Sequence, residues 1–232
     1  YNLMFNHLNV ELPPINATTT DGVRLYETPE GNKYPSITTI LSVRNKSGLM
    51  AWRKRVGEKT ANYIAGKAAA RGTKVHHMCE DFLNNESIEH HQKDFLPWCL
   101  FTQLQKSLIK IDNIHAQEAG LYSDKYKVAG RVDCIAEYTG ESGEPELAII
   151  DFKTAEKPKP KEWIENYFVQ AAAYACMFYE LTDIPVKKLV IIMTCENGEV
   201  EVYEEYNKQY YMKLLVQYIQ KFVEEKLNEY QK

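Results

Sequence analysis

Two acidic residues and a lysine have the spacing that phosphate chemistry requires. Asp151 and Lys153 stand at the end of the apolar run I-I-D-F-K. Residues two apart in a strand project to the same side, so Asp151 and Lys153 point together and Phe152 points away. A second acid, Asp133, closes the segment G-R-V-D. If the two segments pair as a hairpin, Asp133 comes opposite Asp151 and the two carboxylates can share a divalent cation.

The chemistry expected of this group is hydrolysis of a phosphodiester bond. Carboxylate oxygens are hard ligands that suit Mg²⁺ or Mn²⁺ better than Zn²⁺. Two neighbouring carboxylates repel each other, and a shared cation removes that cost. Lys153 would then hold the attacking water or stabilise charge that develops on the phosphate. An aspartate and a lysine two residues apart also fit a simple surface ion pair, so the surrounding sequence has to decide.

A histidine upstream is a candidate nitrogen ligand for the same cation. The segment R-G-T-K-V-H-H-M-C-E, residues 71–80, is typical of a helix, in which His76 and Glu80 lie four residues apart on one face. His77 remains an alternative because the sequence does not fix the phase of the helix. A histidine that only caps a helix or fills the core is the other interpretation.

The segment 153–161, a loop stiffened by prolines, carries four lysines, of which Lys153 is the first and Lys157 the second. Such a loop beside a metal site indicates phosphate contact, although exposed Lys-Pro loops are often only solvated. On the helix that follows, Gln170 and Tyr174 lie four residues apart and would face the substrate.

The charge of the chain is unevenly distributed. Its 232 residues are 44% hydrophobic and 26% charged and carry a formal net charge of −4, a balance typical of a globular protein. Residues 51–79 hold seven basic residues and one acid, which is +6 and leaves −10 for the remainder. This basic segment fits an anionic partner held at one face; a solvated helix face is the alternative.

The five cysteines are scattered without a C-x-x-C pair, which favours a reducing compartment. No apolar run approaches the roughly 18 residues needed to cross a bilayer. We therefore expect no contact with a membrane. The expected location is the cytoplasm of a bacterium or phage-infected cell, or the mitochondrial matrix in a eukaryote. Because the sequence begins with Tyr1, a targeting segment before it stays an open question.

The order of elements predicts an α/β (α+β) protein with a central mixed sheet flanked by helices. Residues 1–35 are interpreted as an N-terminal arm with a small hairpin at Asp21-Gly22. Helices are expected within residues 47–84, with joints at Gly57, Gly66 and Gly72, and over residues 94–110. The remaining expected elements are strands at 117–123, 127–138, 146–154, 189–194 and 200–206 and helices at 162–180 and up to about 230.

Two apolar stripes are interpreted as core rather than as binding surfaces. They are Phe95, Trp98, Phe101, Leu104 and Leu108 in one helix, and Tyr210, Tyr211, Leu214, Leu215, Tyr218, Phe222 and Val223 in the last helix. An interaction module built on the last helix is the alternative.

Four ordered motifs together resemble one nuclease family. R-G-T-x-V-H-x-x-x-E, G-R-V-D, I-I-D-F-K-T and Q-x-x-x-Y resemble the RecB-like branch of the PD-(D/E)XK nuclease superfamily. The resemblance is closest to the mitochondrial genome maintenance exonucleases and their phage and bacterial relatives, which share a P-S-[VI]-T motif like that at Ser36 and a D-F-K-T loop. It implies a restriction-endonuclease-like core: one nuclease domain over residues 36–232, with a helical part at 36–115 and the αβββαβ core completed by 116–232.

The resemblance also implies roles for individual residues. His76, Asp133, Asp151 and the backbone carbonyl of Phe152 would bind Mg²⁺ or Mn²⁺, with Asp133, Asp151 and Lys153 as the catalytic residues. The substrate-binding residues would be Ser36, Arg71, Glu80, Lys157, Gln170 and Tyr174. Relatives with an iron-sulfur cluster carry four suitably spaced cysteines, a spacing this sequence lacks, so no cluster is expected.

The function that follows is a metal-dependent deoxyribonuclease that digests single-stranded DNA from a free end, in replication, repair or recombination. The exonuclease and single-strand parts rest on the resemblance alone. Trp52, Tyr63, Trp163 or Tyr167 would stack on unpaired bases. We expect a monomer, with replication or recombination proteins as further partners. The alternatives are an endonuclease or a junction- or flap-cleaving enzyme of the same fold, and a DNA-binding protein that does not cut.

Overall fold

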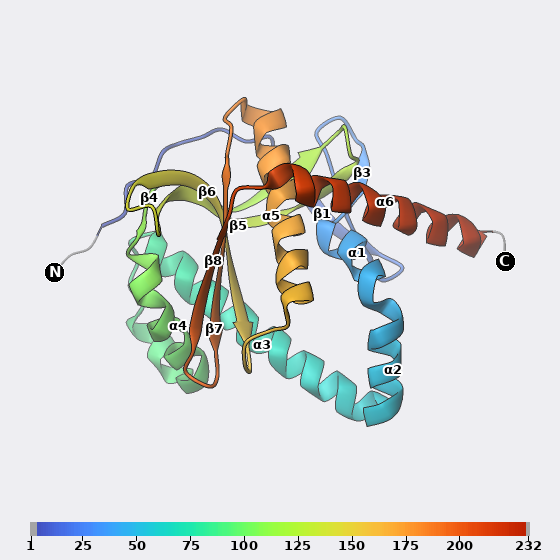
Figure 1. Ribbon diagram of the computed structural model, residues 1–232, viewed down its shortest axis with the longest axis horizontal. Helices are drawn as coiled ribbons and strands as arrows, with labels where there is room; N and C mark the ends of the chain where they lie inside the picture. The colour runs from blue at the N-terminus through green and yellow to red at the C-terminus, as the bar shows by residue number, and fades with distance from the viewer. Residues whose placement is uncertain (1–3, 231–232) are drawn as a thin grey trace.

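A five-stranded mixed sheet forms the centre of the computed structural model, which describes residues 4–230 (Figure 1). The strands lie side by side in chain order, β4 to β8. Only β6 and β7 run parallel, because a helix connects them, and the other neighbours are antiparallel. The strands are β4 (Ile111–Ser123), β5 (Val128–Thr139), β6 (Pro145–Ala155), β7 (Lys188–Cys195) and β8 (Val200–Glu205). The mixed sheet predicted from the sequence is confirmed.

Helices cover both faces of this sheet (Figure 1). On one face lies α5 (Lys161–Thr182), with α1 (Ile37–Ser42) and α6 (Lys208–Tyr230) packed beside it. On the other face lie α3 (Glu58–Leu83) and α4 (Phe95–Leu108). The run of apolar residues in β6 fits this arrangement because Ile149 packs toward α5 and Ile150 toward α3 and α4, both fully buried.

The long helix α3 departs from the sequence-based expectation. A 3₁₀ turn, η1 (Val43–Asn45), leads into α2 (Lys46–Val56), and α2 meets α3 at Gly57. This glycine has φ +89°, a value that a residue with a side chain rarely adopts, so it is a true joint. Gly66 and Gly72 were also expected to be joints, and that prediction is wrong: both lie inside the continuous 26-residue α3. Their neighbours are strong helix formers, and their cost of about 1 kcal/mol each is too small to break the helix.

The N-terminal residues form a small three-stranded sheet of β1 (Asn16–Thr20), β2 (Val23–Glu27) and β3 (Lys33–Pro35). The predicted hairpin is the β1–β2 pair, turned at Asp21 and Gly22, which both have positive φ. The small sheet packs its tyrosines against β4 and β5. The division of the chain at residue 36 remains a prediction.

The two apolar stripes are mostly core, as predicted. In α4, Phe101, Leu104 and Leu108 are fully buried, but Phe95 is 77% exposed and was wrongly included. Phe95 is the first residue of the helix and projects beyond the edge of the packed surface. In α6, Tyr211 and Leu215 are buried, and the Tyr211 ring stacks on Phe168 of α5 with 5.3 Å between centroids. Tyr210 and Val223 are exposed and were wrongly included in the stripe.

Candidate active site

The two acidic residues meet at one end of the β5–β6 pair. The ladder pairs Cys134 with Ile150, and Asp133 comes next, on the side of Asp151. The Asp133 Oδ2 accepts a hydrogen bond of 2.9 Å from the backbone N–H of Phe152. A side-chain carboxylate therefore replaces the partner strand at this point, and this fixes Asp133 beside Asp151.

His76 comes from α3, which lies on the face of the sheet opposite to α5. Its Nε2 lies 3.1 Å from the Asp133 Oδ2, and its Nδ1 lies 2.8 Å from the Gly72 carbonyl oxygen one turn earlier in α3. A neutral histidine whose Nδ1–H donates to a carbonyl can bind a metal ion through its Nε2, which is the usual arrangement of a metal-binding imidazole. His77 points to solvent. The phase of the helix therefore selects His76.

The lysine is held by side chains on both sides. Lys153 Nζ lies 2.8 Å from the Asp151 Oδ2 and donates to the Gln170 Oε1 at 3.1 Å. It also lies 4.6 Å from the centre of the Tyr167 ring. The Gln170 Nε2 in turn donates to the Tyr174 hydroxyl at 3.3 Å. Gln170 and Tyr174 are buried on α5, and Gln170 links Lys153 to the Tyr174 hydroxyl; their substrate roles remain predictions.

Burial and charge shift the pKa values of the group in opposite directions. Burial, reinforced by the charge of Asp133, raises the pKa of Asp151 to about 7, although Lys153 opposes the shift. Burial also acts to raise the pKa of Asp133, but the charge and hydrogen bond of His76 outweigh it and hold this pKa below its ordinary value. The pKa of His76 would fall on burial alone, yet the charge and hydrogen bond of Asp133 raise it to about 10. The pKa values of the two neighbouring carboxyl groups are thus shifted in opposite directions.

The donor set fits a divalent cation. His76, Asp133 and Asp151 each offer one ligand atom, and these atoms lie within 4.8 Å of one another. The Asp151 Oδ2 is buried and, within residues 4–230, lacks a hydrogen bond of normal geometry despite its ion pair with Lys153. A carboxylate oxygen has two lone pairs, so the Asp151 Oδ2 can bind a metal ion while it remains beside the Lys153 ammonium group. Two carboxylates and one imidazole suit Mg²⁺ or Mn²⁺.

Glu118 also belongs to this site, and the sequence analysis missed it. Burial and then the charge of Asp133 raise the pKa of Glu118 to about 7. Its carboxylate lies 3.0 Å from the Arg131 Nε, and its backbone has φ +47°, which is unusual for a residue with a side chain. Nothing in the local sequence marks Glu118, because only the pairing of β4 with β5 brings it to the site.

Arg71 and Lys157, the two basic residues predicted to contact the substrate, lie at the rim of the candidate active site. Arg71 forms a 2.9 Å ion pair with Glu196 and hydrogen-bonds the Thr154 hydroxyl at 3.4 Å. Lys157 is exposed on the Lys-Pro loop. Both residues line one cavity of about 490 Å³ between α3 and that loop. The fold therefore places them on a common surface.

The other two predicted contacts have structural roles. Ser36 is 3% exposed, and its hydroxyl caps α1 by accepting the Thr39 N–H at 3.1 Å. Glu80 follows His76 by one turn of α3, and its backbone carbonyl accepts a hydrogen bond from Gln117. These observed contacts position α1 and β4; the substrate roles of both residues remain predictions.

Gly130, the glycine of the G-R-V-D motif, packs closely against Tyr174, which is linked to Lys153 through Gln170. A Cβ on Gly130 would lie 2.8 Å from the Tyr174 Cε1 and 3.0 Å from the Ile37 Cγ2. We expect Gly130→Ala to lower the free energy of unfolding by about 1–3 kcal/mol, as overpacking does, and to reduce activity by displacing Tyr174 and Gln170. Urea unfolding and a nuclease assay measure the two effects.

Gly72→Ala is the matched control for this substitution. A Cβ there would meet only the Thr154 Oγ1, at an ordinary 3.6 Å. The control should be at least as stable as the wild type, because alanine favours a helix over glycine by about 1 kcal/mol. If Gly130→Ala unfolds like the wild type, the packing argument is wrong.

The comparisons with known proteins agree with this geometry. Residues 51–231 match the model of the PD-(D/E)XK nuclease superfamily, and the chain belongs to that superfamily. It is 27% identical over 155 residues to mitochondrial genome maintenance exonuclease 1 of Homo sapiens, which covers 62% of this chain and 43% of that protein. The protein of the same name from Mus musculus is 30% identical over 139 residues, which covers 56% of this chain and 39% of the relative.

The chain therefore spans less than half the length of the curated relatives that it matches. Among solved structures, Scheffersomyces stipitis Rai1 in complex with (3'-NADP)+ and calcium ion aligns with a TM-score of 0.27 and 15% identity, over 93% of this chain and 55% of that one. We infer nothing from so weak a likeness. Within residues 4–230, no helix is both long and apolar enough to span a bilayer.

Proposed function

We propose that this protein is a divalent-metal-dependent exonuclease that hydrolyses DNA phosphodiester bonds from the free end of a single strand. The observation that carries the proposal is the strand end where Lys153, ion-paired to Asp151, lies beside the cluster of His76, Asp133 and Asp151. Membership of a nuclease superfamily supports the reaction class. The relatives are named as exonucleases, and we propose exonuclease activity for this chain on that basis.

Each residue of the cluster has a distinct task. Asp133, Asp151 and the Nε2 of His76 would hold Mg²⁺ or Mn²⁺, with the Phe152 carbonyl as a further ligand. When bound, the ion supplies positive charge that polarises the phosphate and stabilises its transition state. Lys153 donates a hydrogen bond from its ammonium group to the attacking water or to a phosphate oxygen. Because Gln170 and Tyr167 hold this ammonium group in place, little freedom is lost when the substrate arrives.

A substrate path leads to this lysine. A cavity of about 570 Å³ has Lys153 and Gln170 in its lining, between α1 and α2 on one side and α5 on the other. The cavity of about 490 Å³ that contains Arg71 and Lys157 adjoins it, since Trp163 lines both. A polynucleotide strand that passes Trp163 would run from a basic surface to the catalytic lysine.

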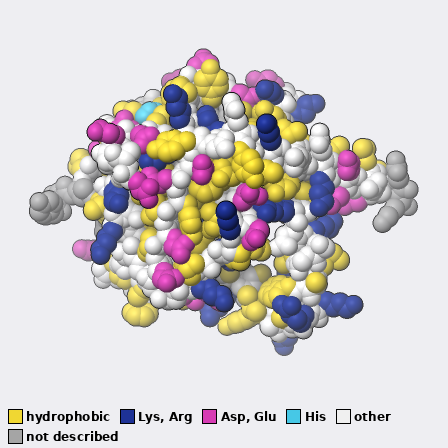
Figure 2. Space-filling model, in the orientation of Figure 1, with side chains coloured by type: hydrophobic (Ala, Val, Ile, Leu, Met, Phe, Trp, Pro, Cys, Tyr) yellow, Lys and Arg dark blue, Asp and Glu magenta, His cyan; other side chains and the backbone are white. Residues whose placement is uncertain are grey.

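The walls of this path suit unpaired bases. Tyr63 is 68% exposed and Trp163 is 42% exposed, and both face the basic cavity. Exposed rings beside positive charge provide stacking surfaces for single-stranded nucleic acid. Figure 2 shows the surface hollowed beside the corner of α2 and α3, with Lys and Arg side chains on both sides of the hollow. A single strand is therefore the substrate that we favour.

The experiment uses DNA topology to separate the alternatives. Labelled linear single-stranded, linear duplex and circular single-stranded DNA are incubated with the protein in Mg²⁺, Mn²⁺ or EDTA. We expect metal-dependent loss of the linear single strand, with the circle intact. Cleavage of the circle would replace the proposal with an endonuclease, and absence of all cleavage by folded protein would replace it with a DNA-binding protein that does not cut.

A further inference from the structure

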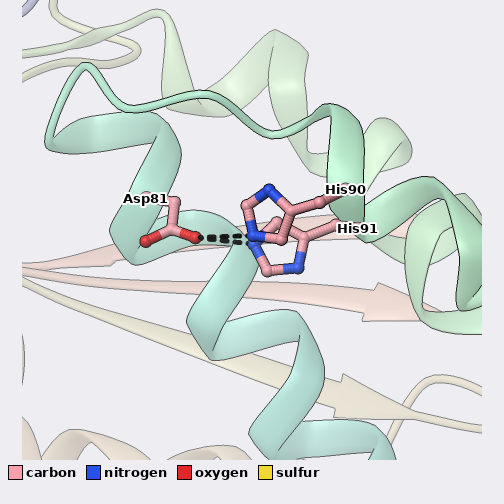
Figure 3. A group of neighbouring side chains, drawn as sticks. All are labelled: Asp81, His90 and His91. Carbon is pink, nitrogen blue, oxygen red and sulfur yellow. Dashed lines mark hydrogen bonds and ion pairs between the residues drawn. The ribbon is translucent and has the colours of Figure 1, made fainter.

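A second cluster of metal-ligating side chains lies outside the candidate active site. It joins the end of α3 to the connection that follows, where a short 3₁₀ helix, η2 (Glu89–Lys93), precedes α4. Asp81 projects from α3, and His90 and His91 project from η2 (Figure 3). Asp81 follows His76 by five residues, so the two side chains are about 7.5 Å apart along the helix axis and point in different directions.

The three side chains converge on one point. The His91 Nε2 lies 2.6 Å from the Asp81 Oδ2, and the His90 Nε2 lies 3.8 Å from the same oxygen. The imidazole rings are 4.0 Å apart at their centroids, and Figure 3 shows both directed at the carboxylate. All three ligand atoms fall within 4.8 Å of one another.

This convergence is better satisfied by a cation than by protons. The His91 Nε2–H can donate to the Asp81 Oδ2 at 2.6 Å, but the His90 Nε2 lies 3.8 Å from this oxygen, beyond hydrogen-bond distance. A metal ion accepts all three lone pairs at once. The side chains of Asp81 and His91 are only 17% and 13% exposed, whereas His90 is 61% exposed and leaves one side open to solvent.

The backbone holds the ligands in place independently of any ion. The Glu86 N–H donates to the Asp81 carbonyl at 2.9 Å, and the His91 N–H donates to the Ile88 carbonyl at 3.0 Å. The Asp94 N–H donates to the His91 carbonyl at 3.1 Å. A site whose ligands are already positioned loses little conformational freedom when it binds a metal.

The ligand set differs in chemistry from that of the active site. Two imidazoles and one carboxylate suit Zn²⁺, whereas one imidazole and two carboxylates suit Mg²⁺ or Mn²⁺. Zinc–ligand distances of about 2.0–2.2 Å in a tetrahedron place neighbouring ligand atoms roughly 3.3 Å apart. The 2.6 Å pair has to open and the 3.8 Å pair has to close, each by less than 1 Å.

We propose that Asp81, His90 and His91 form a Zn²⁺ site, with water as the fourth ligand, that fastens the α3–α4 connection. The ion would tie η2 to the last turns of α3, the helix that carries His76. The site binds zinc without taking part in cleavage, so the proposal does not depend on the nuclease function.

The test is zinc binding by the full chain after treatment with a chelator. Isothermal titration with Zn²⁺ is performed on Asp151→Asn, so that binding at the active site is weakened, and on the same protein carrying Asp81→Asn or His91→Ala. We expect one zinc ion per chain in the first protein. Each added substitution should weaken the affinity by more than about tenfold, since even changes behind a metal ligand cost 10–100-fold. His115→Ala, which removes a histidine outside both clusters, should have no effect.

Two further measurements guard against a folding defect. His90→Ala removes a largely exposed side chain, so it should fold normally and still weaken zinc binding. In the wild type, Zn²⁺ at roughly 100 times its Kd should raise the Tm by about 5–10 °C. In Asp151→Asn, in which magnesium binding at the active site is weakened, Mg²⁺ should not produce such a rise. Equal zinc affinity in Asp81→Asn, His90→Ala and their parent would overturn the proposal, as would the absence of zinc binding by the parent.

Discussion

Lys153→Met should reduce DNA cleavage by about 10²–10³-fold, the usual cost of removing one group that stabilises developing charge. Methionine keeps most of the length and the apolar stem, while the ammonium group and its contact with the Tyr167 ring are lost. The lysine forms an ion pair with Asp151, donates a hydrogen bond to Gln170 and is not among the candidate metal ligands. The variant should therefore bind the metal and DNA but cut slowly.

Asp151→Asn separates the role of the lysine from that of the metal ligands. This variant should lose cleavage and also lose the rise in Tm that Mg²⁺ produces, because Asp151 supplies one of the three ligand atoms. Lys153→Met should lose only cleavage. The measurements are single-turnover cleavage rates at saturating DNA and thermal unfolding with and without Mg²⁺. Cleavage at the wild-type rate by Lys153→Met would remove this lysine from the reaction.

A second lysine provides the control. Lys157→Met changes an exposed lysine four residues further on, in the loop that follows β6. Loss of a phosphate contact should weaken DNA binding and reduce its dependence on salt, with little change in the rate at saturating DNA. A loss of rate equal to that of Lys153→Met would mean that the general charge of the loop, rather than one positioned ammonium group, supports cleavage.

Local periodicity was enough to predict the parts of the site that lie on one element. The two-residue repeat of a strand places Asp151 and Lys153 on the same side, and the structure brings their charged atoms to 2.8 Å. The helical repeat gave two candidates, His76 and His77, and could not choose between them. Packing of α3 on the sheet makes that choice, since it turns His76 toward Asp133.

Features that depend on how separate segments pack together could not be predicted from the sequence. Glu118 reaches the site only through the register of β4 against β5, and it belongs to no motif. Asp81 and His90 come together because the chain folds back after α3, and their nine-residue spacing matches no regular element. The predicted break at Gly66 was wrong because local propensity was misjudged: the helix-forming residues on both sides outweigh the low helix propensity of one glycine.

The stability of the metal-free protein should fall as the pH rises from about 5 to 7. The pKa of Asp151 is raised from its ordinary 3.8, and that of Glu118 from 4.5, to about 7 in each case. Between these values the folded state keeps a proton that the unfolded state has lost, so raising the pH favours unfolding. Each carboxyl group should lower the free energy of unfolding by about 2 kcal/mol over this range. Above pH 6.5, His76 continues the trend because its pKa is raised to about 10.

Magnesium should oppose this loss, and increasingly so at higher pH. The cation takes the place of protons on Asp151 and His76, so its binding releases protons and strengthens as the pH rises. The measurement is urea unfolding at pH 5, 6, 7 and 8 in Mg²⁺ or EDTA. The stability in Mg²⁺ should match that in EDTA at pH 5 and exceed it at pH 8.

Asp133→Asn decides whether this effect arises at the proposed site. Asparagine retains an oxygen that can accept the Phe152 N–H, so the strand end should keep its geometry. The variant removes one of the three proposed metal-ligating side chains and the charge that raises the pKa of His76. The difference between Mg²⁺ and EDTA should therefore vanish at every pH. If Asp133→Asn gains as much stability from Mg²⁺ as the wild type does, the ion binds elsewhere and the three ligands do not form a metal site.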